Sequence, residues 1–252
     1  MSRSISELRV TLWTVGQVWV RLGRPAWILS GLLWIAEQDP QASVCVYPSD
    51  HYYSDESVLA ESVERAFGLT RRKQDSVVLV GARPHGPEVE YGWIEKGAQA
   101  DGKRDSFLVH GFHEKPRKEL AQLLLEQGAL WNTFVMVGKA LAFLELICSA
   151  KPGLLNLFRQ HSIRRAPGEE VRLDESLYAG LESGDFSREV LSREKGRLIV
   201  QRLGEVAWSD LGDCDRAVAA LSKGHDEQEW AANWRAIKRP PHAQGRAVVA
   251  VA

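Results

Sequence analysis

The sequence predicts an α/β fold in which helices flank a Rossmann-like, mixed and mostly parallel sheet. Two observations predict it. Residues 43–47 (SVCVY) and 76–82 (SVVLVGA) are continuous apolar runs, typical of strands in a sheet that is buried on both faces. Residues 54–67 between them have the spacing of an amphipathic helix, so the three segments form a β-α-β unit. With 252 residues, 44% of them hydrophobic, the chain is long enough for one large domain.

The other elements follow in order along the chain. Residues 32–37 are the end of a helix that Asp39-Pro40 stops. Ser54 and Asp55 are suited to cap the helix of the β-α-β unit. We expect further strands at residues 90–95, 106–113, 130–137, 198–202 and 206–208, helices at 117–127, 139–150 and 213–222, and a helix-rich stretch that extends to about residue 183.

Composition shifts divide the chain into three parts: an atypical amino-terminal segment (1–31), a main domain (32–223) and a loosely ordered tail (224–252). The uncharged runs 10–20 and 25–36 are each shorter than the roughly 18 residues that cross a bilayer. The sequence therefore predicts no membrane span. A buried amino-terminal segment is favoured over an anchor on a membrane surface, because the tryptophans there do not share one helical face.

Charge and cysteine content exclude several classes of protein. Lys plus Arg total 32 against 33 for Asp plus Glu, which argues against a nucleic-acid binder that depends on phosphate neutralisation. The three cysteines are far apart and form no CxxC pair, so a disulfide scaffold is excluded and a structural zinc site is disfavoured. Reduced thiols of this kind predict a cytoplasmic protein.

Two aspartates are candidates for a metal site. Asp50 directly follows the first buried strand, and ligands in open α/β sheets lie beyond the carboxyl ends of strands. Asp210 lies in the turn WSDLGD between a predicted strand and a helix. Mg²⁺ is commonly held by one or two carboxylates together with substrate phosphates, so two acids would suffice. Capping of a loop, for Asp50, and of a helix, for Asp210, are the structural alternatives.

The chain contains neither a Walker A sequence nor GxGxxG, so the usual phosphate-binding loops are missing. Three other segments could contact a substrate. Gly92 would let backbone approach a ligand closely, or would only kink a hairpin. Lys115, before a proline, could present its charge to a phosphate while Glu114 accepts from sugar hydroxyls; an exposed ion pair is the alternative. Asn132 could bind a hydroxyl or simply begin a strand.

Taken in order, six segments resemble the sugar-phosphate nucleotidyltransferases, most closely the mannose-1-phosphate guanylyltransferases. They are VYPSDHYYSD, GARPHGPEVEYGWIE, FHEKP, ALWNTFVMV, FSREVL and VAWSDLGD, and the likeness extends from about residue 32 to residue 221. The resemblance implies a fold of the nucleotide-diphospho-sugar transferase type. It also implies that GTP and mannose-1-phosphate, the favoured sugar-1-phosphate, react to GDP-mannose and pyrophosphate. A homo-oligomer is left open.

Roles carried over by position follow from this resemblance. It implies that Asp50 and Asp210 hold Mg²⁺ and that Lys115 contacts the sugar phosphate, which makes Asp50 and Lys115 the catalytic residues. It implies that Gly92, Glu114 and Asn132 contact the sugar. Catalysis would then rest on positioning and charge stabilisation, as in phosphoryl transfer generally.

The chain departs from the family at two places. The family opens with a strand and a Gly-rich loop similar to GGxGTRL, and residues 1–31 contain no such sequence. Many relatives have Ser-Ile-Asp where this chain has Ser187-Arg188-Glu189. We therefore expect an amino-terminally truncated member with weak or absent activity as an isolated chain. The alternatives are a non-catalytic remnant or regulatory subunit that binds a sugar phosphate or a catalytic partner, and a related transferase with another base or sugar.

Overall fold

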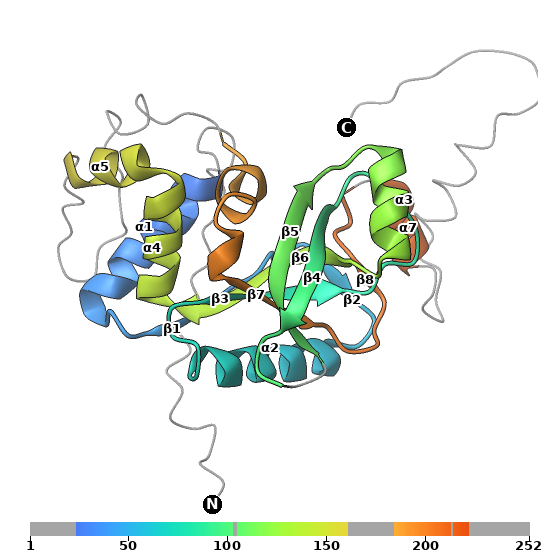
Figure 1. The fold of residues 1–252 in the computed structure, drawn as a ribbon, viewed down its shortest axis with the longest axis horizontal. Helices are drawn as coiled ribbons and strands as arrows, with labels where there is room; N and C mark the ends of the chain where they lie inside the picture. Colours follow the sequence, from blue (N-terminus) through green and yellow to red (C-terminus); the bar gives the residue numbers. More distant parts are fainter. Residues whose placement is uncertain (1–23, 103–104, 161–183, 213, 222–252) are drawn as a thin grey trace, which may run out of the picture.

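The computed structural model describes residues 24–102, 105–160, 184–212 and 214–221. Within these residues a six-stranded sheet lies at the centre, in the order β1-β6-β3-β7-β5-β4 (Figure 1). The predicted amino-terminal segment up to residue 23, the stretch 161–183 and the predicted tail lie outside the described residues. The strands are β1 (Ser43–Val46), β3 (Val77–Ala82), β4 (Gly92–Gln99), β5 (Ser106–Glu114), β6 (Leu130–Lys139) and β7 (Leu198–Arg202).

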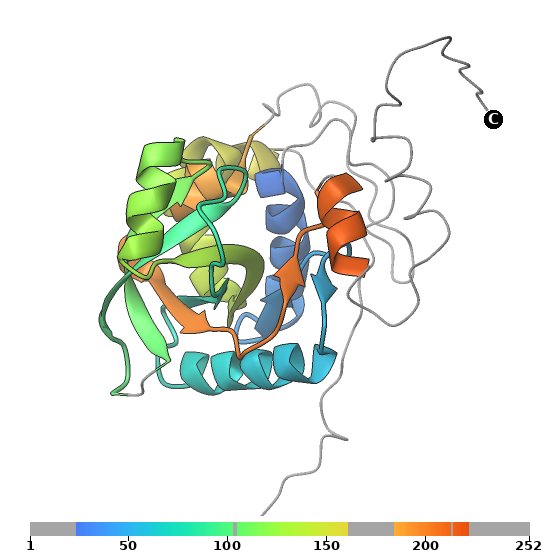
Figure 2. The ribbon, with the colours of Figure 1, turned by 90° about the vertical axis from the view of Figure 1, so that its right-hand side faces the viewer.

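Helices cover the sheet on both sides. Helix α2 runs beneath it in Figure 1, helices α1, α4 and α5 gather at one end, and α3 and α7 at the other. A two-stranded ribbon of β2 (Tyr52–Tyr53) and β8 (Trp208–Ser209) lies next to α7, as Figure 2 shows from that end. The helices are α1 (Arg24–Gln38), α2 (Glu56–Thr70), α3 (Lys118–Glu126), α4 (Ala140–Ala150), α5 (Pro152–Gln160), α7 (Cys214–Leu221), the π-helix η2 (Ser187–Leu191) and the 3₁₀-helix η3 (Lys195–Arg197).

The predicted mixed sheet flanked by helices is confirmed, and its strand order refines the prediction. The expectation that its strands are mostly parallel is wrong for the described pairings, although β1, β3, β7 and β4 run in one direction. Only β3 and β7 are parallel neighbours among the described strands. The predicted β-α-β unit is present, but antiparallel β6 lies between its two strands. Apolar runs identify buried strands without specifying their neighbours, which explains the difference.

Strand β4 is paired on both of its sides. It pairs with β5 along most of its length and with the start of β6 through Trp93↔Trp131 and Ile94↔Leu130. Together with the pairs β6–β3, β3–β7 and β7–β5, this closes five strands into a hydrogen-bonded ring. The strand that begins at Gly92 is therefore held between two neighbours.

Local sequence explains the helices that support the sheet. Asp55 caps α2 as predicted, since its Oδ1 accepts from the backbone N–H of Ser57 at 2.9 Å. Hydrogen bonds from the side chain and then the backbone of Ser57 lower the pKa of Asp55. Helix α1 crosses the predicted boundary at residue 31, and Leu29 and Leu32 are both buried in the core between α1, α4 and the sheet.

Within the described residues, no single helix is long and apolar enough to cross a membrane. Helices α4 and α5 together would be apolar enough, but their axes differ by 114° at the break between them. Several of their apolar side chains, including Phe143 and Leu146, are buried against the sheet.

Gly81 in β3 lies where the sheet leaves no room for a side chain. A Cβ there would be 2.8 Å from Cγ2 of Val200 and 2.9 Å from Cβ of Leu130. Gly81→Ala is therefore expected to lower the free energy of unfolding by about 1–3 kcal/mol, measured by urea denaturation. Gly68→Ala is the control, because no atom lies within 4 Å of its Cβ position in α2 and helix propensity favours alanine. Equal stability of the two variants would contradict the expectation.

Candidate functional site

Gly92, Glu114 and Asn132, which we call the three-strand cluster, come together at one end of the sheet. Gly92 begins β4 and lies opposite Glu114 at the end of β5. A Cβ added to Gly92 would lie 2.7 Å from Oε2 of Glu114 and 3.3 Å from Cβ of Asn132 in β6. The structure thus brings together the three residues predicted to contact the sugar, and glycine is the residue that leaves a space between the other two.

The amide of Asn132 has a fixed orientation. Its side chain is largely buried, and its Oδ1 accepts from the backbone N–H of Phe134 at 3.1 Å. The N–H donors of the same amide therefore face away from that backbone. Phe134 has a φ of 59°, a left-handed conformation that is uncommon for a bulky residue. Its ring packs against that of Phe186 with centroids 5.9 Å apart, so the residue before η2 contacts the strand that carries Asn132.

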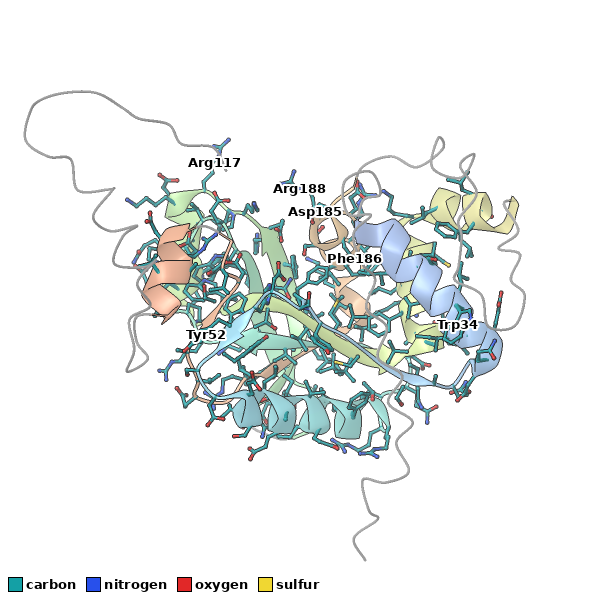
Figure 3. The ribbon with its side chains drawn as sticks, turned by 180° about the vertical axis from the view of Figure 1, so that it is seen from behind. Trp34, Tyr52, Arg117, Asp185, Phe186 and Arg188 are labelled. Carbon is teal, nitrogen blue, oxygen red and sulfur yellow. The ribbon has the colours of Figure 1, made fainter. Side chains whose placement is uncertain are left out.

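Ser187-Arg188-Glu189, the segment that differs from the Ser-Ile-Asp of many relatives, begins the π-helix η2. Glu189 is engaged inside the molecule, because its Oε2 lies 2.5 Å from Nζ of Lys151 and both side chains are mostly shielded from solvent. Arg188 is exposed, and its backbone N–H is capped by Asp185. In Figure 3, Arg188 and Arg117 project from the same upper edge of the molecule, whereas Tyr52 lies lower. This edge therefore carries two guanidinium groups from separate elements.

Lys115 follows the cluster directly and turns back toward β4. Its φ is 49°, and its backbone N–H donates to the carbonyl of Tyr91 at 3.2 Å. Its ammonium group lies 3.1 Å from Oε2 of Glu90, and both side chains are about half exposed (49% and 55%). The exposed ion pair that we considered as an alternative is thus present. In high dielectric such a pair is weak, so separating Lys115 from Glu90 costs little free energy.

The β2–β8 ribbon joins the two predicted metal aspartates. Tyr52 pairs with Ser209 and Tyr53 with Trp208 in antiparallel register, so Asp50, before β2, and Asp210, after β8, lie at the same end of the ribbon. Nε1 of Trp208 also donates to Nδ1 of His51 at 3.3 Å. Segments distant in sequence are therefore neighbours in the fold. Asp50 is exposed and, within the described part of the chain, makes no hydrogen bond or ion pair.

Asp210 has partners that the sequence did not suggest. Its Oδ1 accepts from the backbone N–H of Gly212 at 3.0 Å, a contact within the turn before α7 and not the helix cap predicted as the structural alternative. The same oxygen lies 3.2 Å from Nε of Arg216 in α7. Nη1 of Arg216 lies 3.9 Å from Oε2 of Glu88. Arg216 was missed because its only sequence signal is a basic residue within the first turn of a predicted helix. Asp213, which begins the helix predicted at 213–222, lies outside the described residues.

Tyr91 connects the aspartates to the three-strand cluster. It precedes Gly92 and is 5% exposed, with its ring centroid 4.9 Å from that of Trp131 and 5.0 Å from that of Trp208. Burial raises the pKa of Tyr91 to about 12, and the negative charge of Asp210 acts in the same direction. A neutral phenol therefore lies between the Asp210 turn and the three-strand cluster, which makes these two parts of the site contiguous.

The oxygen atoms of this region suit a hard divalent cation. Among the described residues, no three His, Cys, Asp or Glu side chains gather as a metal cage. Mg²⁺ does not need one, because waters and substrate phosphates complete its shell. The carboxylates of Asp50 and Asp210 would be the protein ligands. Their oxygen chemistry is compatible with Mg²⁺, and Arg216 is a competitor for Asp210.

Comparisons with known proteins identify relatives of the chain. A family model described as "Nucleotidyl transferase" matches residues 26–227. A mannose-1-phosphate guanylyltransferase of Escherichia coli K12 is 27% identical over 180 residues, covering 70% of this chain and 36% of that protein. The chain thus spans little more than a third of that curated relative.

Solved structures show the same fold. A Thermus thermophilus structure titled "mannose-1-phosphate geranyltransferase" is 26% identical with a TM-score of 0.66, covering 81% of this chain and 57% of that one. A Helicobacter pylori structure titled "mannose-6-phosphate isomerase" is 22% identical with a TM-score of 0.60, covering 75% of this chain and 70% of that one.

Proposed function

The chain belongs to the nucleotidyl transferase family, and on this premise we propose that it binds a sugar-1-phosphate for transfer to a nucleotide. Mannose-1-phosphate and GTP are the proposed substrates, since the curated relatives include mannose-1-phosphate guanylyltransferases. The observation that carries the proposal is the three-strand cluster with Lys115 beside it. In the reaction, a phosphate oxygen of the sugar-1-phosphate would attack the α-phosphorus of the triphosphate. The bond to the β-phosphate breaks, and pyrophosphate leaves.

Each residue of the cluster has a separate task in this proposal. Gly92 admits the sugar ring, because its lack of a side chain leaves a space beside Glu114 and Asn132. Glu114 accepts hydrogen bonds from sugar hydroxyls and the Asn132 amide donates to one. Lys115 exchanges Glu90 for the sugar phosphate and neutralises it.

Mg²⁺ is the proposed cofactor, held by Asp50 and Asp210. When bound, it would neutralise the charge that develops on the phosphates. Tyr91, neutral and shielded, keeps the Asp210 turn next to Gly92. The protein's own contribution is then the positioning of two anionic substrates side by side.

The test measures binding and turnover separately. Calorimetry with mannose-1-phosphate reports binding, and pyrophosphate release with GTP and Mg²⁺ reports transfer. Binding together with release supports a transferase. Binding without release supports the alternative of a non-catalytic subunit, and absence of binding by the folded protein contradicts both.

Lys115→Gln is expected to weaken mannose-1-phosphate binding by about 10- to 100-fold, because a charged hydrogen bond to the phosphate is lost. Calorimetry measures the change. Lys195→Gln is the matched control, since Lys195 lies in η3, outside the three-strand cluster, and should leave the affinity unchanged. Equal affinities of the two variants would contradict the role given to Lys115.

A further inference from the structure

Arg216 places its positively charged guanidinium group beside the carboxylate of Asp210. Its Nε lies 3.2 Å from Oδ1 of Asp210, and its guanidinium carbon lies 5.0 Å from the ring centroid of Tyr91. The side chains of Arg216 and Asp210 are 21% and 25% exposed. Water and salt therefore screen this pair less than a surface pair, and the charge of Asp210 is substantially balanced from within the chain.

A divalent ion at Asp210 would meet this guanidinium. A bound Mg²⁺ lies about 2 Å from its carboxylate oxygens, so two cations would share one small carboxylate. Like charges at this separation repel, and each lowers the affinity of the site for the other. Metal binding at Asp210 must therefore either displace Arg216 or be weakened by it.

Glu88 offers Arg216 an alternative partner. Its Oε2 already lies 3.9 Å from Nη1 of Arg216, at the outer limit of an ion pair. The other carboxylate oxygen of Glu88, Oε1, accepts from the backbone N–H groups of Val89 and Glu90 at 2.9 and 3.2 Å, so Glu88 is held in place as a second partner. A small movement of the guanidinium would exchange a partner in the β8–α7 turn for one in the loop that leads to Tyr91.

We propose that Arg216 is a built-in competitor of the divalent metal ion, which it opposes while paired with Asp210 and admits when paired with Glu88. The inference rests on the proposed function, because it takes Asp210 to be a metal ligand. Arg216 acts through Asp210 and is a positioning residue, not a catalytic one. The site would then load metal only weakly until Glu88 takes over the arginine.

The test measures Mn²⁺ binding to the folded full chain without substrate. Electron paramagnetic resonance monitors the binding. Arg216→Met keeps most of the aliphatic stem and removes the charge, so it should bind Mn²⁺ about tenfold more tightly than the unaltered protein. Glu88→Gln should have the opposite effect, because Arg216 loses its alternative partner. Arg83→Gln is the control and should leave Mn²⁺ binding unchanged, since Arg83 pairs with Glu205 in an exposed pair.

Asp210→Asn separates failure of this inference from failure of the proposed metal site. If Asp210→Asn loses Mn²⁺ while Arg216→Met binds no more tightly than the unaltered protein, the metal site stands and the competition is disproved. If the unaltered protein and Arg216→Met both fail to bind Mn²⁺, the metal role of Asp210 is wrong and the inference falls with it. Should Arg216→Met not fold, by circular dichroism, the opposite effect of Glu88→Gln decides the question.

Discussion

Gly92→Ala is expected to lower the affinity for mannose-1-phosphate by about 100-fold or more, the largest effect on binding among the variants proposed here. The added Cβ would overlap Oε2 of Glu114 at 2.7 Å and press against Cβ of Asn132 and Cζ of Phe112, both at 3.3 Å. Glu114 would have to rotate out of the cluster, and the methyl group would take the space given to the sugar. Isothermal titration calorimetry measures the loss.

The control for this variant is Gly86→Ala in the loop before β4. No atom lies within 4 Å of the Cβ position of Gly86, so its affinity should remain that of the unaltered protein. Circular dichroism and urea denaturation should show that Gly92→Ala still folds, with a cost of about 1–3 kcal/mol. A folded Gly92→Ala protein with normal affinity would remove Gly92 from the proposed sugar site.

Trp131→Ala is expected to have the largest effect on stability, a loss of about 3–5 kcal/mol in the free energy of unfolding. Trp131 is 2% exposed and lies at the centre of an aromatic cluster. Its ring centroid lies 4.6 Å from that of His85, 5.9 Å from that of Trp93 and 6.3 Å from that of Trp208. Removing the indole ring leaves a large cavity between the three-strand cluster and the Asp210 turn.

Urea denaturation followed by circular dichroism measures this loss. Leu123→Ala is the control, because Leu123 is 48% exposed and surface substitutions usually change stability by less than about 0.5 kcal/mol. A Trp131→Ala protein that is within about 1 kcal/mol of the unaltered one would show that the aromatic cluster is not the main support of this region.

Much of the fold could be predicted because its signals are local. The runs 43–47 and 76–82 have the apolar composition of buried strands. The helix cap at Asp55 depends only on the side-chain chemistry of that residue. The order of the strands is set by tertiary pairing. No residue pattern indicates that β6 inserts between β1 and β3 or that β4 pairs back onto β6.

The candidate site divides in the same way. Gly92, Glu114 and Asn132 were named from residue type and from the resemblance to the nucleotidyltransferases, and the sheet places them side by side. Phe134 was not found, since a left-handed residue is usually signalled by glycine or asparagine. Arg216 and Glu88 were not found because they meet Asp210 and each other only through the tertiary approach of α7 to the loop before β4.

The pairing of β4 on both sides has a consequence for how a ligand would be received. A strand with an open edge can detach by fraying, whereas β4 leaves the ring only if the ladders to β5 and to β6 both break. Amide protons of Trp93 and Ile94 should therefore exchange with deuterium only in the most costly openings of the molecule. Strand β4 would therefore be rigid at the proposed sugar site before a ligand binds, so little conformational entropy is lost on binding.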